Sequence, residues 1–172
     1  MRNALLAGLF AFVTACGGDE APGLLVNGLA CPTGDAAETL TLDVDAPPAT
    51  GVRVLLENRT AERLQVLRLT STIECATARF RGAEAATYCP ATPRDLPARG
   101  AALGPGEQAE ATVELLSEAD LQALRDALGD LPITLPLRFR ITAEAIAPTG
   151  ELVASDERMK DIDVCAGCGA CR

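Results

Sequence analysis

Apolar and polar residues alternate with a period of two along most of the chain after residue 23. The clearest run is 134–146, in which Leu137, Phe139 and Ile141 alternate with arginine and threonine. Because successive side chains of a strand point to opposite faces, each such run predicts a strand with one buried and one wet face. The predicted strands are 24–29, 38–45, 51–57, 62–70, 72–80, 107–116, 134–146 and 151–164.

Turn-forming residues separate these runs, among them Gly104-Pro105-Gly106 and Pro148-Thr149-Gly150. Strands that are buried on one face and solvent-exposed on the other, joined by such turns, favour antiparallel sheets packed face to face. The sequence therefore predicts an all-β fold, an immunoglobulin-like antiparallel β-sandwich over residues 24–172. The alternation breaks phase at Leu67 and again at 158–160, and a β-bulge would explain either break.

One short helix is predicted at 117–128. Ser117 is a favourable N-cap, and acidic residues follow in the first turn, where the helix dipole favours them. Gly129 and Pro132 end the element. Its leucines fall on one face, so we expect the helix to close an open edge or end of the sandwich.

The segment 81–106 is long and irregular, with four prolines. Loops of this length are more often functional or mobile than ordinary connectors. Cys89 lies inside the segment and is expected to pin part of it.

The N-terminal residues have the features of an export signal. Arg2 precedes a short apolar run at 4–13, and Val13-Thr14-Ala15-Cys16 is followed by a polar, glycine-rich stretch. This arrangement resembles the lipobox of bacterial lipoproteins, and the resemblance covers residues 1–20 only. It implies cleavage before Cys16, a diacylglycerol thioether on that cysteine and acylation of its new amino group.

The resemblance divides the chain into a signal peptide (1–15), a flexible tether (16–23) and the sandwich (24–172). An uncleaved N-terminal anchor and an ordinary signal with a nearby cut are the alternatives. Gly17 follows the cysteine, whereas in enteric bacteria an aspartate there retains a lipoprotein at the inner membrane. By that rule we expect attachment to the outer membrane of the cell envelope through Cys16.

The composition narrows the function. The formal net charge is −9, and it becomes −10 without residues 1–15, so nucleic acid and anionic lipid head groups repel the chain. The chain has no histidine and no tryptophan, and its only lysine is Lys160. These absences remove His-based nucleophile pairs and aromatic stacking platforms. We predict no enzymatic activity, no cofactor and no nucleic-acid partner.

Six cysteines remain after Cys16 is assigned to lipid: Cys31, Cys75, Cys89, Cys165, Cys168 and Cys171. An even number in an exported chain indicates disulfides, and six cysteines allow 15 connectivities. In one arrangement Cys75 pairs with Cys89, one tail cysteine pairs with Cys31 and the other two pair together. In the other, each of the three tail cysteines takes one of Cys31, Cys75 and Cys89.

The tail also resembles half of a bacterial ferredoxin motif, since Cys165, Cys168 and Cys171 form C-x-x-C-x-x-C. A zinc site would need a fourth ligand such as Cys31. Structural disulfides are the favoured interpretation because the tail lacks a fourth cysteine with a following proline.

Carboxylates supply two further candidates. Asp156, Glu157, Asp161 and Asp163 form the densest acidic group, but no calcium-loop motif surrounds them. Asp43 and Asp45 lie on one strand face and could be paired catalytic carboxylates, but a solvated face is the favoured interpretation.

The sequence thus favours a lipid-anchored envelope lipoprotein with a non-catalytic role, either binding an envelope protein partner or serving a structural function. The alternative is an envelope receptor for a small ligand or metal, using the 81–106 loop or the C-x-x-C-x-x-C tail.

Overall fold

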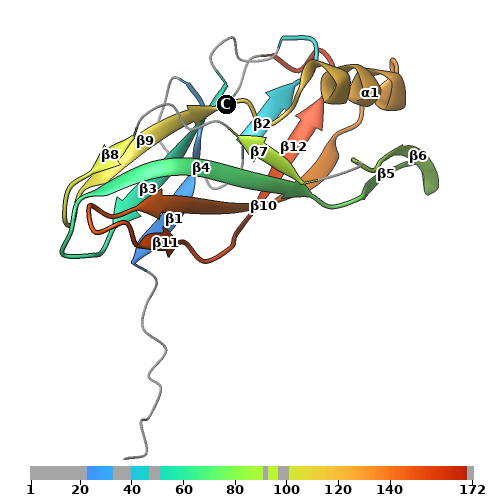
Figure 1. Ribbon diagram of the computed structural model, residues 1–172. Coiled ribbons are helices and arrows are strands. Elements are labelled where there is room, and N and C mark those ends of the chain that lie inside the picture. Colours follow the sequence, from blue (N-terminus) through green and yellow to red (C-terminus); the bar gives the residue numbers. More distant parts are fainter. Residues whose placement is uncertain (1–22, 33–39, 47–50, 91–92, 97–100, 170–172) are drawn as a thin grey trace, which may run out of the picture.

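The computed structural model describes residues 23–32, 40–46, 51–90, 93–96 and 101–169. These residues form an all-β, sandwich-like fold with one helix, α1 (Glu118–Leu128), as predicted (Figure 1). The strands are β1 (Leu24–Ala30), β2 (Leu40–Asp43), β3 (Val52–Asn58), β4 (Leu64–Ile73), β5 (Ala76–Phe80), β6 (Ala83–Tyr88), β7 (Arg94–Leu96), β8 (Ala102–Leu103), β9 (Gln108–Val113), β10 (Leu135–Ile146), β11 (Leu152–Ala154) and β12 (Arg158–Cys165).

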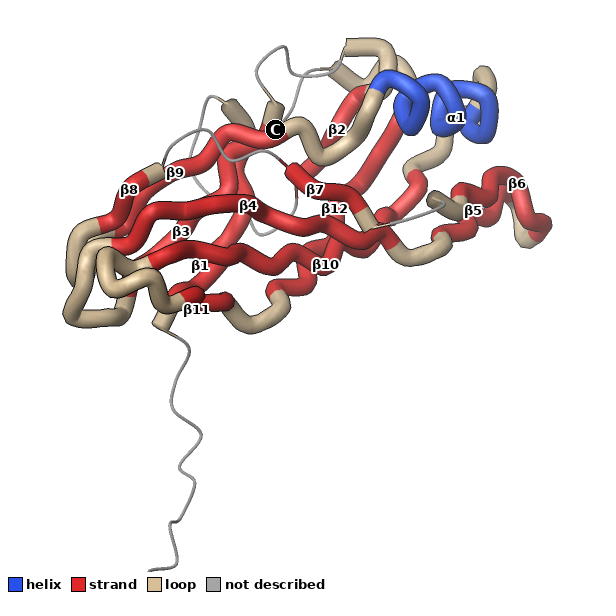
Figure 2. The backbone as a smooth tube through the Cα atoms, viewed as in Figure 1, coloured by secondary structure: helices blue, strands red, loops and turns tan. Residues whose placement is uncertain are grey.

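The strands form two main sheets and a separate hairpin. The smaller sheet has the order β1-β3-β9, and the larger has the order β2-β12-β10-β4-β7, with β11 added to β10 and β8 added to β4. The β5–β6 hairpin extends beyond the large sheet, near α1 (Figure 2).

The core lies between the inner faces of the two main sheets. In β10 burial alternates along the whole strand, with Leu135, Leu137, Phe139 and Ile141 fully buried. Each such side chain contributes roughly 1.5–3 kcal/mol by leaving water. The period of two in the sequence therefore identified the buried face of this strand correctly.

The first phase break is a bulge, as predicted. The pairing of β10 with β4 shifts register between Glu144 and Ala145, so Leu67 has no partner in β10. Its side chain is 46% exposed. β12 pairs with β10 in unbroken register from Arg158 to Val164, so the second shift lies just before the predicted position. Between the pairings of β11 and β12 with β10, residues 155–157 lie opposite 142–143, which is a one-residue shift in register, and the strand predicted at 151–164 is divided into two.

Two strand predictions needed correction. The boundary expected between 62–70 and 72–80 is wrong, since β4 continues through Ser71 to Ile73 before the hairpin begins. The segment 81–106 is not simply a loop: β6 pairs with β5, and the short strands β7 and β8 extend the large sheet beside β4. Short strands without sustained alternation leave little trace in the sequence.

One strand pair departs from the antiparallel arrangement. The edge strand β2 runs parallel to β12, with Ile162 opposite Leu40 and Cys165 opposite Asp43. This pairing places the end of β2 beside the beginning of the cysteine-rich tail.

The N-cap and the apolar face that predicted the helix are both present in the structure. Ser117 and Asp120 form a capping box, and Leu121, Leu124 and Leu128 are buried. Since α1 packs near β6 at one end of the sandwich, it covers that end as expected (Figure 1). Within the described ranges, no helix has the length and apolarity needed to cross a membrane.

Candidate functional site

The two ends of the sandwich differ. At one end β1 begins, where Leu24 pairs with Asn58 and bridges to Ser155 after β11. Six residues later, a distance of roughly 20 Å, Ala30 pairs with Arg53. We call this second end, which includes the start of β3, the helix α1 and the end of β12, the distal end. The chain therefore enters β1 at the end of the sandwich that lies opposite the distal end (Figure 1).

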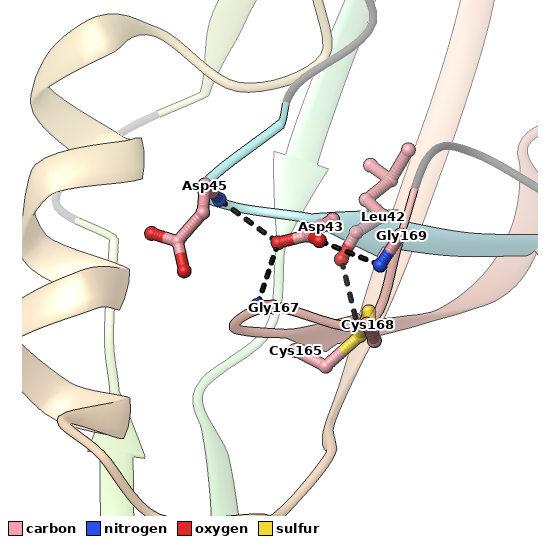
Figure 3. Close-up of a disulfide and its surroundings, with 7 residues drawn as sticks. All are labelled: Leu42, Asp43, Asp45, Cys165, Gly167, Cys168 and Gly169. Carbon is pink, nitrogen blue, oxygen red and sulfur yellow. Dashed lines mark hydrogen bonds between the residues drawn. A yellow bond between two sulfur atoms is a disulfide. The ribbon is translucent and has the colours of Figure 1, made fainter.

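At the distal end, the carboxylate of Asp43 binds the tail through backbone amides (Figure 3). One oxygen accepts the N–H of Asp45 at 2.9 Å and of Gly167 at 3.0 Å, and the other accepts the N–H of Gly169 at 2.7 Å. Only 2% of Asp43 is exposed. We call this arrangement, together with the Cys165–Cys168 disulfide, the Asp43 clasp.

The charge of Asp43 follows from its partners. Burial alone would raise the pKa of the carboxyl, but the N–H groups of Asp45, Gly169 and Gly167 favour the anion and hold the pKa below its ordinary value. The interpretation of Asp43 as part of a solvated face is therefore wrong. Asp45 does lie at the surface, with 53% of its side chain exposed and 3.6 Å from Arg125.

The geometry of the tail explains why its amides converge. Cys165 is joined to Cys168 by a disulfide, which closes a very short loop. Gly167 and Gly169 have positive φ angles of 66° and 94°, which glycine adopts without the steric cost of a side chain. In this oxidised form, neither sulfur of the pair is a thiolate that could bind a metal.

The remaining cysteines of the described residues are also in disulfides. Cys75 is bonded to Cys89, as in the first of the two predicted arrangements, and the pair staples the β5–β6 hairpin. Cys31 is also disulfide-bonded. Cys16 and Cys171 lie outside the described residues, so lipidation and the pairing of Cys31 with a tail cysteine stay predictions.

A second polar cluster fixes α1 to the hairpin. The Tyr88 hydroxyl donates to Asp120 at 2.6 Å, and the guanidinium of Arg94 donates to the other carboxylate oxygen. The same oxygen accepts the backbone N–H of Ser117 at 2.8 Å and its hydroxyl at 2.6 Å. All four groups therefore converge on one carboxylate at the beginning of the helix.

These contacts shift two pKa values in opposite directions. Burial, and then the bond to the Asp120 carboxylate, raise the pKa of Tyr88 far above its ordinary value. Burial also opposes ionisation of Asp120, but hydrogen bonds from Ser117 and Tyr88 outweigh it and lower the pKa of Asp120. The pair is thus a neutral phenol donating to an anionic carboxylate.

A pocket of about 220 Å³ lies at the distal end, between the ends of β2 and β3 and the segment that leads into α1. Its apolar lining comes from Leu42, Val52, Leu115, Leu116 and Leu121. Asp43, Glu114 and Glu118 also line it. No feature of the sequence pattern pointed to this pocket, because its walls come from three separate segments.

Two residues of the acidic group near the C-terminus, Glu157 and Asp161, pair with arginines of β10. Arg138 contacts Asp161 at 2.7 Å, and Arg140 contacts Glu157 at 2.9 Å and also Glu74. Across the described part of the chain, no group of three or more Cys, Asp or Glu side chains is arranged to hold a metal ion.

The chain was compared with known proteins at the level of sequence. No protein-family model matches it, and no curated protein matches it either.

Proposed function

We propose that this protein is a lipoprotein of the bacterial cell envelope, anchored to the outer membrane through acylated Cys16, whose sandwich has a non-catalytic protein-binding or structural role. The main support for this proposal is the lipobox-like sequence at 13–16, which is followed by a short polar tether and a disulfide-stapled domain. Disulfides persist in exported proteins, which agrees with an export signal.

The position of the tether supports a binding role for the distal end. Residues 16–23 precede β1, and a fully extended tether of this length reaches about 24 Å. Because the chain enters β1 at the opposite end, the distal end is the part of the domain furthest along β1 from the anchor. The pocket and the Asp43 clasp would then be available to a partner in the envelope.

The hydrogen-bond partners of the two buried carboxylates support a non-catalytic role. Asp43 is engaged by backbone amides, and Asp120 is engaged by Tyr88, Arg94 and Ser117. Both carboxylates hold segments of the fold together, and their lowered pKa values suit a permanent anion better than a group that exchanges protons near neutral pH.

The anchor is tested by replacing Cys16 with serine in the full chain. We expect the wild-type protein to sediment with membranes and to lose residues 1–15. Cys16→Ser should keep its signal segment, because cleavage before this cysteine follows its lipidation. Identical processing and membrane association of the two proteins would refute the anchor.

The binding role is tested by placing a photo-cross-linking amino acid at Gln122, an exposed position on α1, and at Glu151, an exposed position in the turn before β11. We expect a discrete cross-linked envelope protein from position 122 and none from the control position 151. Cross-linking from position 151 alone would contradict a distal binding surface.

A further inference from the structure

The size of the distal pocket limits what it can hold. Sites for drug-sized ligands and cofactors measure roughly 300–1,000 Å³. At about 220 Å³ this pocket is smaller than that range. It suits a single amino-acid side chain inserted by another molecule.

Five of the side chains that line the pocket are aliphatic. Leu42, Val52 and Leu115 are each no more than 4% exposed, and Leu121 is 8% exposed. A side chain that enters this space can place methylene or methyl groups against these aliphatic residues.

The charged side chains that line the pocket are all acidic. Glu114 is exposed, and 84% of the Glu118 side chain is exposed, so both carboxylates meet water at the pocket. Among the residues that the structure describes, no lysine or arginine lines the pocket. Arg125, outside the lining, contacts Glu118 at 3.4 Å and Asp45 at 3.6 Å and donates to the Val44 carbonyl, so an incoming cation would compete with it for Glu118 only.

Apolar walls beneath an acidic rim match a side chain that is aliphatic along its stem and cationic at its tip. Lysine and arginine have this construction, and both bury their methylene stems while the charged head stays in water. We propose that the distal pocket is the docking site for a lysine or arginine side chain presented by a basic segment of the envelope partner. This inference rests on the proposed function, because it names the chemistry of the partner that the distal end would bind.

The overall charge favours the same class of partner. The formal net charge of the chain is −9, so a basic partner is attracted at long range and an acidic one is repelled. The side chain in the pocket would set the position of the partner, while the surrounding charge would speed its approach.

The test uses the full-length lipoprotein in a nonionic detergent, with its leucine methyl groups labelled for NMR. The probes are three short peptides, acetyl-Gly-X-Gly-amide, in which X is lysine, arginine or norleucine. Norleucine keeps an aliphatic stem but has no charge. We expect the lysine and arginine peptides to shift the methyl signals of Leu115, Leu116 and Leu121, with Leu152 at the surface of β11 as the internal control.

Two charge variants distinguish binding in the pocket from nonspecific electrostatic attraction to the acidic chain. Glu114→Gln with Glu118→Gln removes two charges at the rim, whereas Glu62→Gln with Glu151→Gln removes two exposed charges away from it. Each exposed ion pair contributes at most about 1 kcal/mol, so the rim variant should weaken binding of the lysine peptide about fivefold. The control variant should change it less than twofold.

Three outcomes would overturn the proposal: equal binding of the norleucine peptide, equal loss in the two variants, or no shift of the pocket methyl signals. None of these outcomes bears on processing at Cys16 or on cross-linking from position 122. Failure of the pocket proposal is therefore distinguishable from failure of the proposed function.

Discussion

Replacing Asp43 with asparagine tests whether the buried carboxylate holds the tail. The substitution preserves the shape of the side chain but leaves a single acceptor oxygen. In the native protein one oxygen accepts two backbone N–H groups, and the other accepts the N–H of Gly169 at 2.7 Å. An amide nitrogen in that second position would face another donor, so the bond to Gly169 is lost.

The expected cost follows from the number and kind of bonds. A hydrogen bond to a charged group contributes about 1.5–3 kcal/mol, and a neutral one about 0.5–1.5 kcal/mol. Losing the bond to Gly169 and the charge assistance of the other two should therefore lower the free energy of unfolding by about 3 kcal/mol. For a domain of this size, that corresponds to a fall in Tm of about 9 °C.

The effect should depend on pH in a defined direction. Because the pKa of Asp43 is lower in the folded protein than its ordinary value, its contribution is fully present above about pH 5 and is lost as the pH falls through the folded pKa. The difference in Tm between wild type and Asp43→Asn should therefore be largest at neutral pH and shrink as the pH falls through the folded pKa.

Thermal unfolding of the protein in detergent, followed by circular dichroism, measures both effects. Asp45→Asn is the matched control, since this aspartate is half exposed and should change the free energy of unfolding by less than about 0.5 kcal/mol. The reasoning is refuted if the two variants unfold at the same temperature, or if the deficit of Asp43→Asn is unchanged in acid.

Three further predictions concern the rest of the fold. Tyr88 is the only tyrosine and the chain has no tryptophan, so ionisation of this phenol can be followed by ultraviolet absorbance without interference. The phenol should ionise far above pH 10 in the native protein and at about pH 10 in the urea-unfolded chain. A native titration at the unfolded position would contradict the buried bond to Asp120. Leu69→Ala should destabilise by about 3 kcal/mol in urea unfolding, while Leu67→Ala at the bulge should be near neutral. Equal effects would mean that the register is wrong. Removing the Cys75–Cys89 disulfide by double alanine substitution should cost about 3 kcal/mol, because it frees a loop with a sequence separation of 14; an unchanged urea midpoint would refute this.

Strand positions were predictable where burial is one-sided. In β10 every second side chain is buried, so the alternation alone identified the strand and its inner face. Leu67 was also recognisable, since an extra residue in one strand shifts the phase of all residues beyond it. The helix was predictable from Ser117 and the leucine spacing, because capping and amphipathicity are local properties.

The candidate site was less predictable because its partners are distant in the sequence. Asp43 has the same place in an alternating pattern as a solvated residue, and the amides that bind it belong to a tail more than 120 residues away. The parallel pairing of β2 with β12 creates that contact, and strand order cannot be read from alternation. Likewise, Tyr88 and Asp120 meet only because the hairpin folds back against α1.

The most direct test of the account is the intact mass of the protein extracted from native membranes, with thiols alkylated before and after reduction. The account predicts a chain that begins at acylated Cys16, with no alkylation before reduction and alkylation of the six other cysteines afterwards. A chain that retains residues 1–15, or free thiols at Cys165 and Cys168 in the native protein, would contradict it.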